Sequence, residues 1–235
     1  MVRIRAFRAI NDTLSCEKFA EGHRQVLISY GINQVTSSKL DWLSNPEVYV
    51  ILVESLIDGE ILGGTRIHVA NHTHPLPMEE ALGKMDEKVY TLVKQYSSRG
   101  TGELCGLWTT RETSGKGISI LLTEAGVAEA GIALAQQLKL NSIFVLCAPW
   151  TVAMAKNAGF IIEDSVGDKG TFPYPKPDLL ATLLTIHDIE TLEAATPDER
   201  ERIYDLRNNP KQIKIENGPK GILEIEYDLL VKTPN

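Results

Sequence analysis

The segment from Glu103 to Ser119 has residue types that could bind a phosphate group. It reads Glu-Leu-Cys-Gly-Leu-Trp-Thr-Thr-Arg-Glu-Thr-Ser-Gly-Lys-Gly-Ile-Ser, so a strand-like apolar run leads into a loop with two glycines, and a helix-like run follows. Unpaired amide groups and the positive end of the dipole meet at the start of a helix, which favours an anion there. Glycine allows the backbone to approach a pyrophosphate closely, and Arg111 and Lys116 add positive charge.

Two common phosphate loops do not fit this segment. A Walker A loop requires Gly-x4-Gly-Lys-Ser/Thr, but Thr110 stands at the first glycine position and Gly117 follows the lysine. A dinucleotide-binding loop requires Gly-x-Gly-x-x-Gly after the first strand of a βαβ unit, but Ile120 stands at the third glycine position, in the middle of the chain. A different kind of phosphate loop is therefore expected.

Other side chains could perform acid–base, nucleophilic or metal chemistry. Glu103 opens a strand, and a partly desolvated carboxylate at the edge of a cleft could act as a general base, whereas a solvated one would only end the strand. No histidine is an obvious partner for Cys105, so we expect a small buried hydrophobe there and not a nucleophile. His72 and His74 have the spacing of metal ligands but lack a nearby third ligand, so no metal site is predicted.

These residues are embedded in an alternating pattern of strands and helices. The sequence Asp58-Gly59 predicts a hairpin between two β-rich runs, and periodic apolar residues after Pro75 and Pro77 predict one amphipathic helix as far as Tyr96. Strands are predicted at 3–10, 48–57, 60–70, 103–110 and 142–147 and within 160–166 and 179–187, with helices at 14–30, 118–138 and 151–158.

A shorter region follows this pattern. Thr196-Pro197-Asp198-Glu199 is a capping box with proline at the first helical position, which predicts a helix to about Leu206. Strands at 212–216 and 222–231 then form a hairpin. We therefore divide the chain into a main domain, 1–190, and a C-terminal extension, 191–235, which could cap the sheet or form a homodimer interface.

The composition excludes several classes of protein. Of 235 residues, 43% are apolar and 23% charged, which is typical of a folded globular chain. The 24 basic and 31 acidic residues give a net charge of −7 without a dense basic block, so nucleic acid is not an expected partner. No apolar run approaches the ~20 residues of a membrane span. With three dispersed cysteines and no apparent signal peptide, the expected location is the cytoplasm.

The loop and its surroundings resemble the GNAT (GCN5-related N-acetyltransferase) superfamily. That family's pyrophosphate loop reads Arg/Gln-x-x-Gly-x-Gly/Ala between the fourth strand and the third helix, and Ser114 to Ser119 align with it through the central Gly117. The following strand, helix and Gly159-Phe160 also match in order and spacing, over about residues 3–187. The resemblance implies an α/β (α+β) fold whose mainly antiparallel sheet is flanked by helices and whose fourth and fifth strands splay apart.

The same resemblance implies an acyl-CoA-dependent N-acyltransferase that transfers an acetyl or longer acyl group directly to a small amine. Glu103 would be the general base, and a backbone amide near Leu107 or Trp108 would polarise the thioester. Ala155 occupies the position at which many relatives have a tyrosine general acid. The residues expected to bind the coenzyme are Leu107, Trp108, Thr109, Ser114, Gly115, Lys116, Gly117, Ile118, Ser119 and Asn157.

A narrower resemblance is to the N-acyl-homoserine-lactone (autoinducer) synthases, a GNAT branch. The segment from Gly63 to Ile67 looks like that branch's Gly-x-x-Arg-Leu, although Gly106 replaces the arginine of its Glu-Leu-Ser-Arg motif. Arg24, Asp41 and Arg66 are the matching positions, and Arg24 and Arg66 are the expected substrate-binding residues. The alternative is a non-catalytic acyl-CoA-binding or regulatory module, because Ser114, Ser119 and Ala155 depart from the common pattern.

Overall fold

The computed structural model describes residues 1–32, 35–36, 39–110, 127–218 and 221–231. The strands are β1 (Val2–Arg8), β2 (Val48–Ser55), β3 (Ile61–Val69), β4 (Gly102–Thr109), β5 (Ile143–Cys147), β6 (Ile161–Ile162), β7 (Thr171–Pro173), β8 (Leu180–Ile186), β9 (Lys211–Gly218) and β10 (Gly221–Asp228). The helices are α1 (Thr13–Ser29), α2 (Pro77–Leu82), α3 (Lys88–Ser97), α6 (Glu129–Gln137), α7 (Val152–Asn157) and α8 (Pro197–Asn208), and the short 3-10 turns include η3 (Asp41–Ser44) and η5 (Pro149–Thr151).

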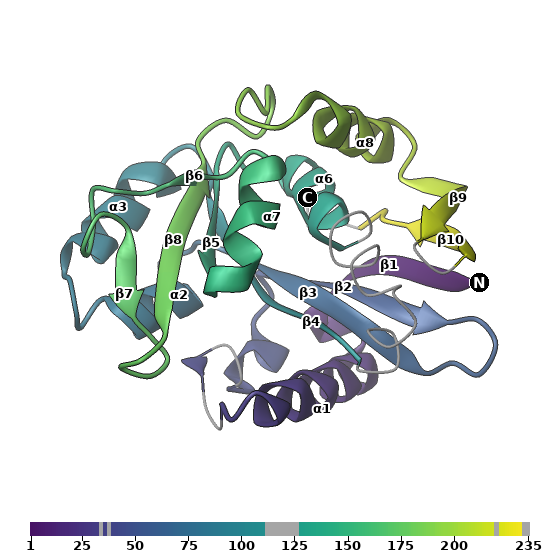
Figure 1. Cartoon of the computed structure of the whole chain (residues 1–235), viewed down its shortest axis with the longest axis horizontal. Helices are drawn as coiled ribbons and strands as arrows, with labels where there is room; N and C mark the ends of the chain where they lie inside the picture. Colours follow the sequence, from purple (N-terminus) through teal and green to yellow (C-terminus); the bar gives the residue numbers. More distant parts are fainter. Residues whose placement is uncertain (33–34, 37–38, 111–126, 219–220, 232–235) are drawn as a thin grey trace.

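All these strands form one sheet in the order β6-β8-β5-β4-β3-β2-β1-β10-β9, with β7 beside β8. Neighbouring strands are antiparallel except β4 with β5 and β1 with β10. The fold class expected from the sequence is therefore confirmed: a mixed, mainly antiparallel sheet flanked by helices (Figure 1).

Helices cover both faces of the sheet. In β2, Ile51 and Val53 belong to the core under α6 and α8, whereas Val50 and Leu52 belong to the core under α1 and η3. A strand covered on both sides is expected to be apolar throughout, which is why the sequence of β2 does not alternate. In Figure 1, α1 lies below the sheet and α6 and α8 lie above it.

Strands β4 and β5 pair over a short stretch only. Their parallel register joins Glu103 with Phe144 and Leu104 with Val145, after which β4 continues to Thr109 beside β3 alone. A β-bulge interrupts the pairing of β3 with β4, and Gly106 at the bulge has φ +66°, a conformation that favours glycine. The expected splay of the fourth and fifth strands is therefore present in the structure.

The helix predicted from Pro75 to Tyr96 is wrong, because the structure divides it into α2 and α3. The Asp86 carboxylate accepts hydrogen bonds from the amides of Lys88 (3.0 Å) and Gly167 (2.8 Å), so a new helix starts there. A Cβ atom on Gly83 would lie 2.2 Å from the ring of Tyr90. The break therefore depends on the distant Gly167 as well as on packing between the two short helices, and apolar periodicity reveals neither.

The C-terminal extension continues the main sheet. The expected helix and hairpin are present as α8, β9 and β10, and β10 pairs in parallel with β1, with Val2 opposite Ile225. Strand β7 was not predicted, and the strand expected within 160–166 is reduced to β6. The predicted loop at 113–117 and the first part of the predicted helix 118–138 lie outside the described residues.

Candidate active site

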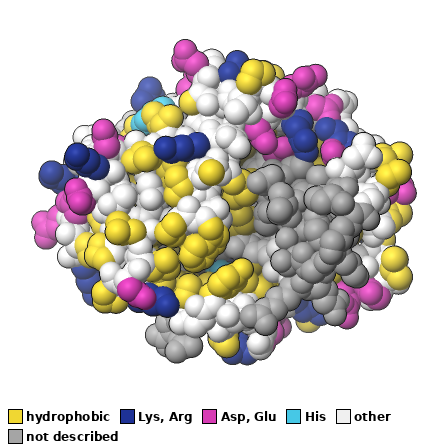
Figure 2. All heavy atoms as spheres, in the orientation of Figure 1, with side chains coloured by type: hydrophobic (Ala, Val, Ile, Leu, Met, Phe, Trp, Pro, Cys, Tyr) yellow, Lys and Arg dark blue, Asp and Glu magenta, His cyan; other side chains and the backbone are white. Residues whose placement is uncertain are grey.

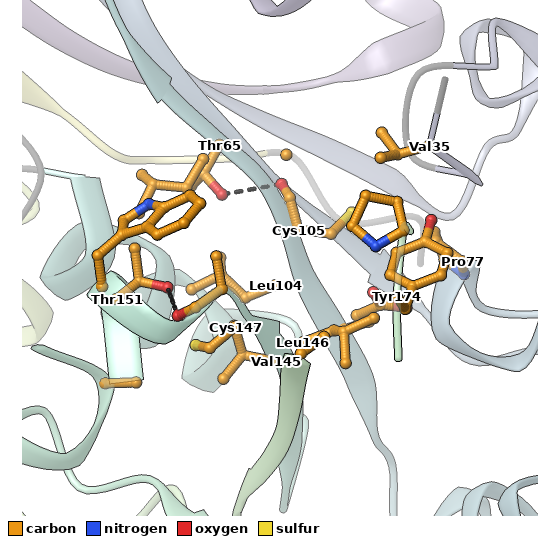
Figure 3. Close-up of a pocket in the computed structure, with 18 of the residues that line it drawn as sticks. Val35, Thr65, Pro77, Leu104, Cys105, Val145, Leu146, Cys147, Thr151 and Tyr174 are labelled. Atoms are coloured by element: carbon orange, nitrogen blue, oxygen red, sulfur yellow. Dashed lines mark hydrogen bonds between the residues drawn. The ribbon is translucent and has the colours of Figure 1, made fainter. Parts of the chain in front are cut away.

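A cavity of about 230 Å³ passes through the gap between β4 and β5. Its walls come from both faces of the sheet: Leu27 belongs to α1 on one face and Met154 to α7 on the other. Figure 2 shows hydrophobic side chains gathered between these two helices, and Figure 3 shows Leu104 and Cys105 of β4 near Val145 and Cys147 of β5. A small molecule could therefore reach both faces of the sheet through one opening.

Glu103 is the one aspartate or glutamate among the described lining residues, and only 2% of its surface is exposed. Its Oε2 atom accepts a hydrogen bond from the amide of Met78 (2.7 Å). Burial raises the pKa of Glu103 to about 8, although this hydrogen bond and the charge of Arg66 oppose the shift. The carboxyl is thus positioned to exchange a proton near neutral pH.

Arg66 lies beside Glu103 on the same face of the sheet, because β3 and β4 pair Arg66 with Cys105 and His68 with Glu103. Its guanidinium is buried and lies 4.2 Å from the ring centre of Trp42. Its Nη2 atom is 3.9 Å from the Cys105 sulfur. Burial nevertheless raises the pKa of Cys105 to about 12, which keeps it a thiol and argues against nucleophilic catalysis.

A second cavity of about 160 Å³ lies next to the first, and we call it the polar cavity because charged residues such as Lys39, Asp41 and Glu80 are among those that line it. The two cavities share Thr36 and Pro77 as wall residues, and Arg66 and His68 line the second one. His68 is 7% exposed, and its Nε2 atom has no hydrogen-bond partner among the described residues. Burial and the charge of Arg66 place the pKa of His68 well below its usual value, so the ring is neutral.

The sequence did not single out His68. Alternation along β3 places residues 66 and 68 on one face of the sheet, and this pattern could have pointed to His68. The pairing of His68 with Glu103 of β4 depends on the β-bulge, however, and cannot be read from the sequence. The predicted match Asp41 also lines this second cavity. The structure thus brings together Glu103, Arg66 and Asp41 from separate motifs and adds His68.

Other predicted residues lie elsewhere. Arg24 is on the exposed side of α1, where its Nη2 atom is 2.7 Å from Glu21, and it does not line either cavity. Trp108 is buried against Phe19 and Gly22 and likewise lines neither, so its side chain packs in the core. Asn157 is exposed at the end of α7.

Two of the expected coenzyme-binding positions lie near the gap. Leu107 lines the cavity, and Thr109 ends β4 beside Gly63 of β3. Ala155, at the family's tyrosine position, is a buried part of the cavity wall. The loop residues Ser114, Gly115, Lys116, Gly117, Ile118 and Ser119 lie outside the described residues, so their role remains a sequence-based prediction.

The described residues contain no group of three or more His, Cys, Asp or Glu side chains arranged to hold a metal ion. None of the helices in the described part of the chain has both the length and the apolar character needed to cross a bilayer.

No known family model matches the sequence, and no curated protein is significantly similar to it. Solved structures do resemble it in fold. FeeM, an N-acyl amino acid synthase from uncultured soil microbes, has a TM-score of 0.61 at 13% identity, covering 83% of this chain and 99% of that one. BjaI, a CoA-dependent acyl-homoserine lactone synthase solved with SAM and isopentyl-CoA, has a TM-score of 0.57 at 14% identity, covering 93% and 95%.

MesI, a second CoA-dependent acyl-homoserine lactone synthase, has a TM-score of 0.51 at 15% identity, covering 88% of this chain and 95% of that one. The chain therefore has a GNAT-type fold, with the splayed strand pair that the sequence predicted. The N-acyl amino acid synthase and the two acyl-homoserine lactone synthases named above share this fold.

Proposed function

We propose that the protein is an acyl-CoA-dependent N-acyltransferase that transfers its acyl group directly to a small amine. The observation that carries this proposal is the cavity through the β4–β5 gap, with the buried carboxyl of Glu103 in its wall. The same class of reaction is supported by two proteins that share the fold, the N-acyl amino acid synthase FeeM and the CoA-dependent acyl-homoserine lactone synthase BjaI.

In this proposal the thioester lies in the gap and the amine approaches from the polar cavity. Glu103, in its ionised form, accepts a proton from the ammonium, and the neutral amine nitrogen that results attacks the thioester carbon. The C–N bond forms and the C–S bond breaks, and the second proton lost by the nitrogen passes to the departing thiolate, so that the coenzyme leaves as a thiol. The β-bulge at Gly106 interrupts the regular pairing of β3 with β4 next to Leu107. In this proposal, backbone amides at the bulge polarise the carbonyl oxygen of the thioester.

Binding and turnover test this proposal separately. Isothermal titration with CoA and acyl-CoAs is expected to show binding, and thiol release is expected when a panel of small amines, including SAM and amino acids, is added. Gly117→Glu, in the predicted pyrophosphate loop, is expected to weaken CoA binding strongly because it adds bulk and negative charge. Absence of CoA binding to the folded wild-type protein would refute the proposal.

The second candidate is a non-catalytic acyl-CoA-binding module. It is favoured by the alanine at position 155, which leaves the usual general-acid position without a proton donor. This candidate predicts CoA binding without thiol release for every amine in the panel, whereas the enzyme releases thiol with at least one of them.

A further inference from the structure

Strand β9 forms one edge of the sheet. Its eight residues, Lys211–Gly218, pair with β10 in a continuous register, from Lys211 opposite Asp228 to Gly218 opposite Gly221. In the described sheet β9 is the last strand in the order, so its outer edge has no strand beside it. In Figure 1, β9 and β10 lie at the right-hand end of the sheet. A long and regular edge strand presents a row of backbone donors and acceptors with which another strand can pair.

The side chains of β9 leave this edge open. Gln212 and Lys214 contact Asp205 of α8, so alternation places Ile213 and Ile215 on the opposite face of the sheet. Ile213 is 60% exposed there and Ile215 is 70% exposed. Free edges are commonly blocked by a proline, a β-bulge or a very short strand, and β9 has none of these along its eight residues. Its composition is therefore typical of a strand that pairs with a partner.

The charges of β9 favour a second copy of the same strand as that partner. If two antiparallel copies meet with Ile215 opposite itself, Lys214 of each copy lies opposite Glu216 of the partner subunit. Opposite charges directly across a strand pair stabilise it, and like charges destabilise it. Moving the centre by one residue would place Lys214 or Glu216 opposite its own equivalent. Charge therefore selects the register that is centred on Ile215, in which Ile213 is a diagonal neighbour of Ile215 of the partner subunit.

Pairing through β9 closes at two copies. Each β9 strand occupies the free edge of the other, and the opposite end of the described sheet is β6, which has only two residues. So short a strand offers little backbone for a further copy to pair with. The arrangement is therefore a twofold-symmetric pair and not a filament.

We propose that the protein is a homodimer in which β9 of one copy pairs in antiparallel fashion with β9 of the other over residues 212–218, so that the two sheets become one. Ile215 lies on the twofold axis, and two Lys214–Glu216 contacts between the copies flank it. The inference is independent of the proposed function, because four strands separate β9 from β4 and the gap beside it.

Sedimentation velocity of the full chain, at low- and high-micromolar concentrations, tests the inference. The wild type is expected to sediment with the mass of two chains. Ile215→Lys brings two ammonium groups together on the twofold axis and is expected to weaken dimerisation by about 100-fold or more. Ile57→Lys is the matched control, because Ile57 is 85% exposed in the turn between β2 and β3, and it is expected to leave the mass unchanged. A monomeric wild type would overturn the inference and leave the edge to a strand of another protein, and equal effects of the two variants would also overturn it.

A charge exchange between subunits tests the register. Lys214→Glu and Glu216→Lys each place like charges opposite one another, so each variant alone is expected to be mainly monomeric. An equimolar mixture restores both opposite-charge contacts and is expected to form a heterodimer. Each substitution also removes an ion pair within its own chain, to Asp205 or to Arg202, which mixing does not restore. Recovery of the dimer thus reports the contact between subunits alone, and a mixture of the two folded variants that stays monomeric would overturn the pairing.

Discussion

Glu103 shows how one residue can be prepared for proton transfer by its surroundings. Burial favours the neutral carboxylic acid, while Arg66 and the Met78 amide favour the carboxylate. Burial is the largest of these effects, so the pKa is about 8 and the group is mostly protonated in the free protein at pH 7. The ionised form of Glu103, which is the form that can accept a proton, becomes more abundant as the pH rises.

Replacing Glu103 with Gln keeps the shape of the side chain and removes its ability to accept a proton. We expect kcat to fall by about 100-fold or more, with CoA affinity preserved. In the wild type, kcat/KM is expected to rise with pH through an apparent pKa near 8, and this limb is expected to be absent in Glu103→Gln. Initial rates between pH 6 and 9.5 provide the measurement. A normal kcat in the variant would assign the base to another group.

Cys105 is expected to be dispensable for the chemistry. Its thiol is half-buried, burial raises its pKa to about 12, and direct attack by the amine needs no acyl-enzyme intermediate. Cys105→Ala should therefore retain most of the wild-type turnover. Intact-protein mass spectrometry after mixing the wild type with acyl-CoA should show no acyl adduct, and an adduct on Cys105 together with an inactive alanine variant would establish a covalent mechanism.

At the level of elements, the position of α1 depends on one glycine. A Cβ atom on Gly22 would lie 2.0 Å from the indole of Trp108, whose ring packs edge-on to Phe19. The helix therefore approaches β4 closely because position 22 has no side chain. This contact helps to set the distance between α1 and the cavity.

Gly22→Ala tests this close approach. Helix propensity alone would make alanine stabilising by about 1 kcal/mol, but overpacking against a buried indole costs about 1–3 kcal/mol. We expect a net loss of stability in urea unfolding. Gly131→Ala on α6 is the comparison, because its Cβ would meet only the end of the Leu104 side chain, at 2.7 Å, and should cost less. A stabilising Gly22→Ala would show that Trp108 moves aside easily.

The elements that the sequence predicted are those that local residues determine. Asp58-Gly59 gives the hairpin of β2 and β3 without help from the rest of the chain, and Thr196 caps α8 by accepting a hydrogen bond from the Glu199 amide (3.4 Å). The break between α2 and α3 was missed because Gly167, which binds Asp86, is 81 residues away. The same reason applies to the candidate site: the motif was enough to propose Glu103, but its position opposite His68 depends on strand register.

At the scale of the whole molecule, the C-terminal extension is joined to the main sheet by ion pairs as well as by strand pairing. Arg202 of α8 lies 2.9 Å from the buried carboxylate of Glu129 in α6 and 3.8 Å from that of Glu216 in β9. Arg202 therefore connects α8 with α6 and with the β9–β10 hairpin.

Arg202→Ala should destabilise the protein, because it leaves Glu129 buried without a cation. We expect a loss of about 1–2 kcal/mol, less than for a fully buried pair because Arg202 is partly exposed. Burial raises the pKa of Glu129 to about 10, so the loss should be largest above that pH, where the carboxylate is ionised, and should shrink as the pH falls through it. Arg24→Ala, which removes an exposed pair with Glu21, is the control and should leave the stability almost unchanged. If both variants lose the same stability, the contact between Arg202 and Glu129 contributes no more than an exposed ion pair.

The short register between β4 and β5 gives the substrate a structural role of its own. In the described sheet, strands β5 to β8 join the remaining strands only through the pairing of residues 103 and 104 with 144 and 145. A molecule in the gap would contact α1 and α7 at once, and so would add contacts beside two strands that pair over only two residues each. Hydrogen–deuterium exchange should therefore slow at the end of α1 and in α7 together, with the same dependence on acyl-CoA concentration. Slowing on one side only would mean that the ligand stays on one face of the sheet.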